Sequence, residues 1–311
     1  MAPTPQPPSL ILHADDFGFN AAVTAGILEA FRSGLLTGTS LLANAPAADL
    51  AVEQWRRLES ARQTGNLPSS ATRRRLGDVA APFDLGAHLN LTQGVPLTAG
   101  AYPDELLDAS GRFLGPGALY RRLCSRGRRW RGAIRGELQA QVEWLLHRGL
   151  TPTHLNGHQY VEMMPVVSGV IAELAQEYRV LYVRAATEPG HWRTSLSPGL
   201  RLTNCCLSGV KQYYARRWAA ALDRAGLAHA DAFFGASHAG QIDLALVRHF
   251  IRRAGKHGLT EMALHPGGLS REPDQREIAA GWHDPLAAAR PGELALLRST
   301  ELVELLAEKG F

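Results

Sequence analysis

Short apolar segments alternate with amphipathic helical segments along nearly all of this 311-residue chain. Segments at 10–18, 38–44 and 83–91 have the length and apolar character of buried strands. Helical spacing of apolar residues follows at 21–33 and 47–62. Parallel neighbours in a sheet need a crossover, usually a helix, so this alternation predicts an α/β fold with a parallel sheet. The number of units predicts a closed or nearly closed TIM-like barrel, with an open doubly wound sheet as the alternative.

The second half of the chain continues the alternation. The expected helices cover residues 137–147, 165–178 and 294–309. The expected strands cover residues 180–184 and 260–268, with weaker candidates at 200–203 and 230–235. No glycine-rich phosphate fingerprint follows the first strand, which argues against a dinucleotide-binding fold.

The chain is expected to form a short tail and one domain. Residues 1–8 are rich in proline and lack the basic and apolar regions of a signal peptide, so they predict a disordered tail. No linker interrupts residues 9–311, which are therefore expected to form a single catalytic domain. Residues 63–78 are polar and predict a solvated loop.

Residues 97–135 are the expected insertion, because periodicity weakens there while glycine, proline and arginine accumulate. Such a basic segment can bind phosphates or an anionic lipid surface. The alternative is the exposed side of a helix whose buried stripe includes Leu119, Leu123 and Trp130.

Composition limits the classes of partner and compartment. The net charge of +4 is small and both signs are spread along the chain, so no nucleic-acid partner is expected. No apolar run approaches the length that spans a bilayer. Cys124, Cys205 and Cys206 lack a metal-binding spacing and make a poor structural disulfide, which is typical of a cytoplasmic protein.

Two adjacent acidic residues, Asp15 and Asp16, end the first apolar segment. Ionised carboxylates side by side repel each other, which is tolerable where one binds a cation and the other is held for proton transfer. The alternative is an ordinary turn that caps the next helix. His13 is expected to face the core, and we assign it no role.

Polar residues gather where the expected strands end. In a parallel barrel these ends converge on one rim, where active sites form. Several histidines on one rim with two carboxylates favour a functional site over a set of isolated structural residues. The residues expected there are Asp15, Asp16, Asn44, His88, His154, Asn156, His158, Arg184, Ser237, His238 and His265.

Asp16, His88 and His158 come from three separate strands and form a set of one carboxylate and two imidazoles. Such a set binds one divalent cation and leaves positions open for water and substrate. The cation polarises a carbonyl and lowers the pKa of its bound water. The expected chemistry is metal-assisted hydrolysis of an amide or ester.

Three further residues complete the expected mechanism. Asp15 lies beside the ligand Asp16 and can take a proton from water. His265, on a late strand, is placed to protonate the leaving amine. Arg184 is expected to orient Asp15 or to stabilise developing negative charge.

Four motifs resemble the YdjC-like carbohydrate deacetylases, a family that includes chitooligosaccharide deacetylases and hopanoid-biosynthesis-associated proteins. They are His-Ala-Asp-Asp-Phe-Gly at 13–18, Gly-Ala-His-Leu-Asn-Leu-Thr at 86–92, Pro-Thr-His-Leu-Asn-Gly-His-Gln at 152–159 and Leu-His-Pro-Gly at 264–267. Their order and spacing match the family from about residue 9 to 270. Each motif is weak alone, and the combination is specific.

The resemblance implies a distorted TIM-like barrel related to the polysaccharide deacetylases, and hydrolysis of an N-acetyl group on an amino sugar. It also implies that Asp16, His88 and His158 are the metal ligands and that the metal is magnesium. Two imidazole ligands chemically favour zinc or another transition metal. The metal therefore stays open.

The chain departs from the family's third motif, since Asn156, Tyr160 and Glu162 replace residues of a His-x-Asp-x-His-x-His-x-His pattern. These changes bear mainly on the substrate, because His158 is retained. The residues expected to contact substrate are Asn44, Asn90, His154, Tyr160 and His238. His154 has a second interpretation, as a residue that supports His158.

An acetylated amino sugar, free or in an oligosaccharide or glycolipid, is the expected substrate. The sequence leaves open whether that sugar is lipid-linked and whether the chain forms a homodimer. Two other functions remain as alternatives. One is a carbohydrate-binding protein without catalysis, and the other is a metal phosphoesterase whose arginine-rich insertion attracts phosphate.

Overall fold

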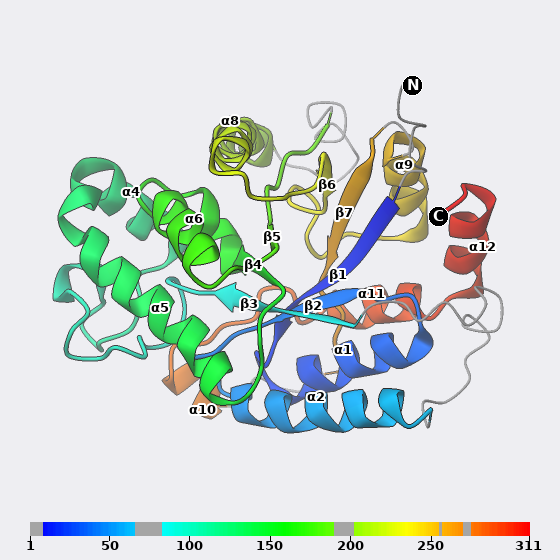
Figure 1. Cartoon of the computed structure of the whole chain (residues 1–311), viewed down its shortest axis with the longest axis horizontal. Helices are drawn as coiled ribbons and strands as arrows, with labels where there is room; N and C mark the ends of the chain where they lie inside the picture. Colours follow the sequence, from blue (N-terminus) through cyan, green and yellow to red (C-terminus); the bar gives the residue numbers. More distant parts are fainter. Residues whose placement is uncertain (1–8, 66–82, 190–201, 255–256, 270–274) are drawn as a thin grey trace.

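A computed structural model describes residues 9–65, 83–189, 202–254, 257–269 and 275–311. Seven strands form one sheet in the order β5-β4-β3-β2-β1-β7-β6, and every strand pair in it is parallel (Figure 1). The strands are β1 (Ser9–Phe17), β2 (Gly38–Leu41), β3 (Asp84–Leu89), β4 (His154–Gly157), β5 (Tyr182–Val183), β6 (Ala232–Phe234) and β7 (Leu259–Leu264). The predicted distorted TIM-like α/β barrel is confirmed.

Helices cover the outside of the curled sheet, with α1 and α2 below it and α4, α5 and α6 beside β3 and β4 in the view of Figure 1. The α-helices are α1 (Ala21–Ser33), α2 (Ala48–Gln63), α4 (Pro116–Arg126), α5 (Arg131–His147), α6 (Val167–Glu177), α8 (Leu202–Ala225), α9 (Leu244–Ala254), α10 (Gln275–Ala279), α11 (Arg290–Leu297) and α12 (Thr300–Glu308). Short 3₁₀ helices are η1 (Asp104–Leu106), η2 (Gly127–Trp130) and η3 (His158–Met163). Within the part of the chain described, no helix combines the length and apolar character needed to cross a membrane.

The helix α1 has the bounds that the sequence predicts, because a capping residue marks its start and another marks its end. Asn20 caps the start by accepting a hydrogen bond from the Val23 backbone N–H at 2.9 Å. Gly34 ends the helix in the left-handed region, at φ 96°, which costs glycine little. Between them Ile27 and Phe31 are buried against the sheet.

The barrel has a seam between β5 and β6, the two edge strands of the sheet. Isolated contacts replace a continuous ladder there. The Val183 N–H donates to the Ala228 carbonyl at 2.9 Å, and the Phe233 N–H donates to the Thr187 carbonyl at 2.9 Å. The barrel is therefore curled round until its edges meet, without a strand ladder that closes it.

Two sequence predictions of secondary structure are wrong. The weak strand expected at 200–203 is wrong in its described part, residues 202–203, which begins the helix α8; residues 200 and 201 lie outside the described part of the chain. The single closing helix expected at 294–309 is two helices, α11 and α12, because the Ser299 hydroxyl accepts the Leu302 N–H at 3.2 Å and starts a new helix. Residues 1–8, and the loop predicted at 63–78 from residue 66 onward, lie outside the described part of the chain.

The segment 97–135 contains η1, α4, η2 and the first turn of α5. Leu119, Leu123 and Trp130 are buried, as expected for a helix that has one apolar face. The arginines at 121, 122, 126, 128 and 129 are exposed. The segment is thus a packed amphipathic element whose basic side faces outward.

Helix α1 approaches the segment after β7 so closely that only glycine fits at position 26. A Cβ atom on Gly26 would lie 2.5 Å from the Gly267 Cα and 2.7 Å from the Gly268 nitrogen. We expect Gly26→Ala to lower the free energy of unfolding by about 1–3 kcal/mol or more, because backbone atoms must move apart. Gly136→Ala, on the open side of α5, should instead raise it by about 0.5–1 kcal/mol. Urea unfolding measures both; equal effects of the two changes would contradict the close approach.

Candidate functional site

A β-bulge at the end of β1 directs the side chains of two neighbouring acidic residues toward the same pocket. Consecutive residues of a regular strand face opposite sides. Here the pairing of β1 with β2 shifts between Ala14 and Phe17, and Asp16 has a left-handed φ of 70°. Asp15 and Asp16 therefore both line a cavity of about 290 Å³ at the carboxyl ends of the strands. The strain falls on a residue of the expected metal site, where strained backbone is commonly found.

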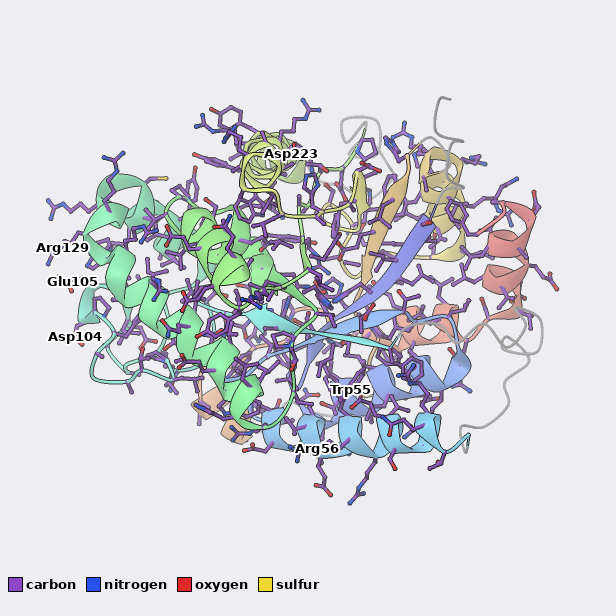
Figure 2. The ribbon with its side chains drawn as sticks, viewed as in Figure 1. Trp55, Arg56, Asp104, Glu105, Arg129 and Asp223 are labelled. Carbon is purple, nitrogen blue, oxygen red and sulfur yellow. The ribbon has the colours of Figure 1, made fainter. Side chains whose placement is uncertain are left out.

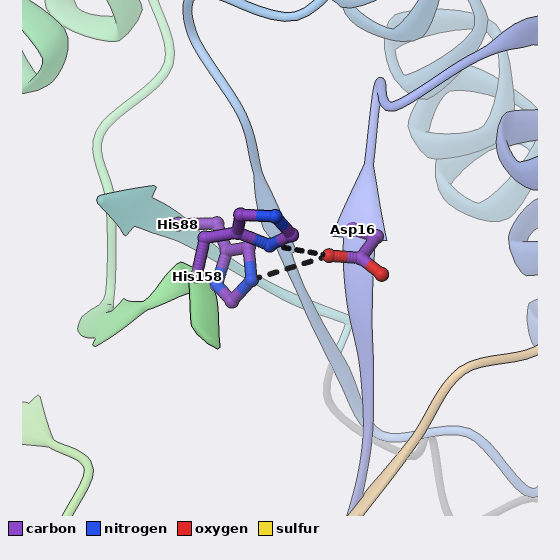
Figure 3. Close-up of side chains that lie close together, drawn as sticks. All are labelled: Asp16, His88 and His158. Atoms are coloured by element: carbon purple, nitrogen blue, oxygen red, sulfur yellow. Dashed lines mark hydrogen bonds and ion pairs between the residues drawn. The ribbon is translucent and has the colours of Figure 1, made fainter. Parts of the chain in front are cut away.

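Asp16, His88 and His158 converge as the sequence predicts (Figure 3). His158 Nδ1 lies 2.9 Å from Asp16 Oδ1, and His88 Nε2 lies 3.4 Å from the same oxygen. One donor atom from each residue lies within 4.8 Å of the others, and all three side chains are buried. This set of two nitrogens and one oxygen can hold a divalent cation.

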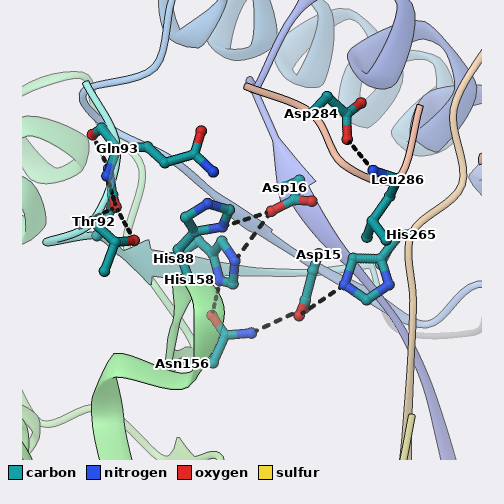
Figure 4. A network of polar contacts seen from close by, with 12 residues as sticks. Asp15, Asp16, His88, Thr92, Gln93, Asn156, His158, His265, Asp284 and Leu286 are labelled. Carbon is teal, nitrogen blue, oxygen red and sulfur yellow. Dashed lines mark hydrogen bonds and ion pairs between the residues drawn. The ribbon is translucent and has the colours of Figure 1, made fainter. Parts of the chain in front are cut away.

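Asn156 fixes the orientation of His88 and connects it to Asp15 (Figure 4). The Asn156 amide donates to Asp15 Oδ1 at 3.2 Å, which leaves Asn156 Oδ1 to accept from His88 Nδ1 at 2.8 Å. His88 is then protonated at Nδ1, and its Nε2 faces Asp16. Metal-binding histidines commonly have such a partner on the other ring nitrogen.

The charges around His88 also suit a cation. Burial lowers the pKa of His88, but the neighbouring carboxylates of Asp15 and Asp16 outweigh it and raise the pKa above its ordinary value. Burial lowers the pKa of His158 despite the same Asp16. A bound divalent cation would take the place of the proton that the carboxylates favour on His88.

Arg184 holds Asp15 by two hydrogen bonds, from Nη1 to Oδ2 at 2.6 Å and from Nη2 to Oδ1 at 2.8 Å. Its Nε donates to Glu261 Oε1 at 2.8 Å, so one fully buried guanidinium joins two carboxylates. Burial raises the pKa of Asp15, but Arg184 and His88 hold the pKa well below its usual range. Asp15 is therefore ionised in a fixed orientation.

Arg290, at the start of α11, plays the corresponding part for Asp16. Its Nη2 donates to Asp16 Oδ2 at 2.8 Å, and its Nε donates to Asp284 Oδ2 at 2.7 Å. Burial raises the pKa of Asp16, but Arg290 and His158 outweigh it and keep the pKa well below the ordinary value. The Asp16 oxygen that faces the histidines, Oδ1, is not the one bonded to Arg290.

His265 follows β7 and lies on the other side of Asp15 from Asn156 (Figure 4). Its Nε2 is 4.0 Å from Asp15 Oδ2, and its backbone N–H donates to Glu293 at 2.6 Å. Its Nδ1 has no hydrogen-bond partner among the described residues. The imidazole lines the pocket opposite the three-residue cluster.

Three of the five residues expected to contact substrate lie in the pocket or beside it. Tyr160 lines the pocket, whereas Asn44 and Asn90 brace the loop that follows β3. Asn44 donates to the Val95 carbonyl at 3.0 Å, and Asn90 donates to the Gln93 carbonyl at 2.7 Å. These asparagines act on the pocket through Gln93, which lines it.

His154 lies away from the pocket, so its predicted rim position is wrong. His238 follows β6, between Ala236 and Ala239 of the pocket lining, but is not itself a lining residue. The His238 ring is buried edge-on against Phe250, with ring centres 5.7 Å apart. His154 is the first residue of β4, at the opposite end of the barrel, and its Nε2 lies 2.8 Å from His13 Nε2. His13, to which the sequence gives no role, lies 2.9 Å from Asp15 Oδ1 and 3.0 Å from Arg184 Nη2. It belongs to the polar network that holds Asp15.

Gln159 and Tyr160 form a strained turn directly after His158. Both have left-handed backbone angles, with φ of 54° and 61°, although neither is glycine. This turn places Tyr160 in the pocket, where Lys211 of α8 lies 5.4 Å from the ring centre. Burial raises the pKa of Tyr160 well above its usual value, so its hydroxyl keeps its proton.

Sequence reasoning misses several residues of the site. Glu261 has a usable signal, because a charge inside the apolar strand β7 needs a buried partner, and Arg184 ends another strand. Arg290 and Lys211 have no such sequence signal, since each lies on a helix that carries no motif. Only the folded chain brings them to the pocket.

The profile of the YdjC-like proteins matches residues 9–308, from the first residue of β1 to the last of α12. The chain belongs to the YdjC-like family. The family resemblance expected from the four motifs is thereby confirmed.

Named relatives of this YdjC-like protein include the carbohydrate deacetylases of Mus musculus and Homo sapiens. Each is 31% identical to this chain over 97% of its length, and the matches cover 91% and 88% of the relatives. The carbohydrate deacetylase of Geobacillus stearothermophilus is 37% identical over 55% of this chain and 57% of its own.

A solved structure from Enterococcus faecalis has the same fold. Its name proposes cleavage of cellobiose phosphate, and it superposes with a TM-score of 0.69 at 20% identity. The superposition covers 99% of this chain and 96% of that one. At this identity the likeness concerns the fold of the YdjC-like protein alone.

Metal binding is the first test of the cluster. We expect one equivalent of zinc to bind and to stabilise the fold by about 2.7 kcal/mol at a concentration 100-fold above Kd. His158→Gln removes a ligand and should abolish this gain, whereas His229→Gln, on a histidine paired with Asp223 outside the cluster, should keep it. Calorimetric titration with zinc and magnesium measures both, and two imidazoles should favour zinc. Undiminished binding by the His158 variant would contradict the site.

Glu162 should make stability depend on pH. It is fully buried, and neither carboxylate oxygen accepts a hydrogen bond from another described residue. Burial raises its pKa from 4.5 to about 8, so the folded state keeps a proton that the unfolded state releases. The free energy of unfolding should therefore fall, by a few kcal/mol at most, as the pH rises from about 4.5 to 8. Glu162→Gln should remove this fall in the free energy of unfolding, whereas Glu301→Gln, at an exposed position, should not. Urea unfolding of the three proteins at several pH values between about 4.5 and 8 measures the difference.

Proposed function

We propose that this protein is a metal-dependent hydrolase that removes the acetyl group from an acetylated amino sugar. The observation that carries the proposal is the pocket in which Asp16, His88 and His158 converge beside the separately held carboxylate of Asp15. The names of relatives that match nearly the whole chain support the same substrate class. Amide hydrolysis needs a polarised carbonyl, an activated water and a proton for the amine, and the pocket has groups for each.

Asp16, His88 and His158 would hold the cation. The fit rests on the buried donor set and on Asn156, which leaves His88 Nε2 directed at Asp16. A divalent cation supplies Lewis-acid polarisation of the acetyl carbonyl and lowers the pKa of water. Magnesium follows from family resemblance, and zinc or another transition metal follows from the two imidazoles.

Asp15 is proposed as the base that accepts a proton from the attacking water. Its low pKa makes it a weak base by itself, so it depends on a water whose own pKa is lowered. Arg184 is a positioning residue, because it is buried behind Asp15 and does not line the pocket. It keeps one edge of the Asp15 carboxylate oriented during proton transfer.

His265 is proposed as the acid. When the carbon–nitrogen bond breaks, the leaving nitrogen takes a proton from the imidazole, and acetate and a free amine are the products. Its ring lies across Asp15 from the three-residue cluster, so the acetamido group would lie between base and acid. Tyr160, with its protonated hydroxyl, is proposed to contact the sugar.

Acetate release from N-acetylglucosamine and N,N′-diacetylchitobiose tests the proposal. We expect Asp15→Asn and His265→Gln each to lower kcat/KM by about 10²–10⁴, because each removes one proton-transfer group. EDTA should abolish turnover, and added zinc or magnesium should restore it. Asp49→Asn, a carboxylate on the exposed part of α2, should leave the rate unchanged.

The variants also separate the alternatives. His265→Gln leaves the Asp15–Arg184 pair in place, so a loss of activity at unchanged Tm assigns the effect to chemistry. Sugar and metal binding without acetate release would replace the proposal with a carbohydrate-binding protein. Hydrolysis of p-nitrophenyl phosphate without acetate release would replace it with a phosphoesterase.

A further inference from the structure

One face of the molecule concentrates positive charge beside the pocket. Every charged residue between positions 109 and 136 is an arginine. Arg129, Arg131 and Arg135 form ion pairs with Glu105, Glu173 and Glu177. The outward side of α4 and η2 differs, because Arg121, Arg122, Arg126 and Arg128 are exposed and have no carboxylate partner among the described residues.

Helix α8 extends this face. The Tyr120 hydroxyl of α4 and the Tyr214 hydroxyl of α8 lie 2.8 Å apart, which joins the two helices. On α8 the side chains of Val210 and Tyr213 are 50% and 55% exposed. Arg217 donates to the Tyr213 hydroxyl at 2.9 Å, so an apolar and aromatic edge lies directly beside a cation.

The basic side is also hollowed. Arg126, Arg128 and Arg129 line a depression of about 630 Å³ together with Ser125 and Val166. Guanidinium groups around a concave surface suit phosphate, because their donors match its oxygens. A flat, solvated helix face has no such concave site for a phosphate group.

We propose that this face, formed by α4, η2 and residues 210–217 of α8, docks onto an anionic membrane surface. Arginines without carboxylate partners attract the phosphate headgroups, and exposed Val210 and Tyr213 suit the boundary between headgroups and acyl chains. Nucleic acid or an acidic protein would satisfy the charge but leave the apolar edge unused. Pro116 of α4 and Lys211 of α8 both line the site pocket, so docking brings its entrance close to the headgroups.

Co-sedimentation with lipid vesicles tests docking. The full chain should bind vesicles of phosphatidylcholine mixed with phosphatidylglycerol, bind pure phosphatidylcholine far more weakly, and dissociate as salt rises. R121Q/R122Q should weaken binding roughly 30-fold, at about fivefold for each arginine. R56Q/R57Q removes the same charge from α2, on a different side of the molecule from α4 and η2 (Figure 2), and should leave binding nearly unchanged.

Two further measurements test the apolar edge of α8 and the basic side of α4 separately. V210S/Y213S should weaken vesicle binding while retaining its salt dependence, because the charges remain. A polarity-sensitive fluorophore on exposed Cys124 of α4 should shift to the blue with anionic vesicles, and the same labelling of Cys124→Ser should show no such shift.

The outcomes separate docking from the proposed deacetylation. R121Q/R122Q touches no pocket residue, so it should keep its Tm and its activity on soluble sugars even if vesicle binding is lost. Absence of binding to anionic vesicles at low salt would overturn docking, and so would equal losses from R121Q/R122Q and R56Q/R57Q. Tighter binding of an RNA oligonucleotide than of anionic vesicles would assign the face to nucleic acid instead.

Discussion

Two neighbouring carboxylates remain ionised in one buried pocket because each has its own guanidinium. Arg184 holds Asp15 and Arg290 holds Asp16. Removing one partner from such a buried pair typically costs about 3–5 kcal/mol, since it leaves an uncompensated charge. Three strands separate β5, which precedes Arg184, from β1 in the sheet. Arg184 therefore reaches Asp15 only across the interior of a curled sheet, and the site depends on that curvature.

The sequence predicts the centre of the site well, and the reason is topological. Asp16, His88 and His158 end strands that are all parallel, so their carboxyl ends meet at one rim wherever those strands lie in the sheet. The same reasoning misplaces His154, because a motif does not state at which residue its strand begins. It also gives no role to His13, because its partners His154 and Arg184 come from β4 and from the end of β5, far along the chain.

Periodicity predicts the helices where local signals mark both ends, as Asn20 and Gly34 do for α1. It fails at 202–203, the described part of the strand expected at 200–203, where helix α8 begins, because so short a run cannot separate a strand from a helix. No local pattern predicts that Arg290 and Lys211 belong to the site. Both are far from the motifs in sequence, and they reach the pocket because α11 and α8 pack around the barrel.

The seam between β5 and β6 has a consequence for how such a protein diversifies. Each of these strands has a ladder on one side only, and Asp16, His88 and His158 of the candidate metal site lie on or directly after β1, β3 and β4. The chain between the edges, which includes α8 and Lys211, can lengthen or change without breaking a ladder that positions those residues. The seam is thus the place where the lining of the pocket can change while the strands that carry the Asp16–His88–His158 cluster stay paired.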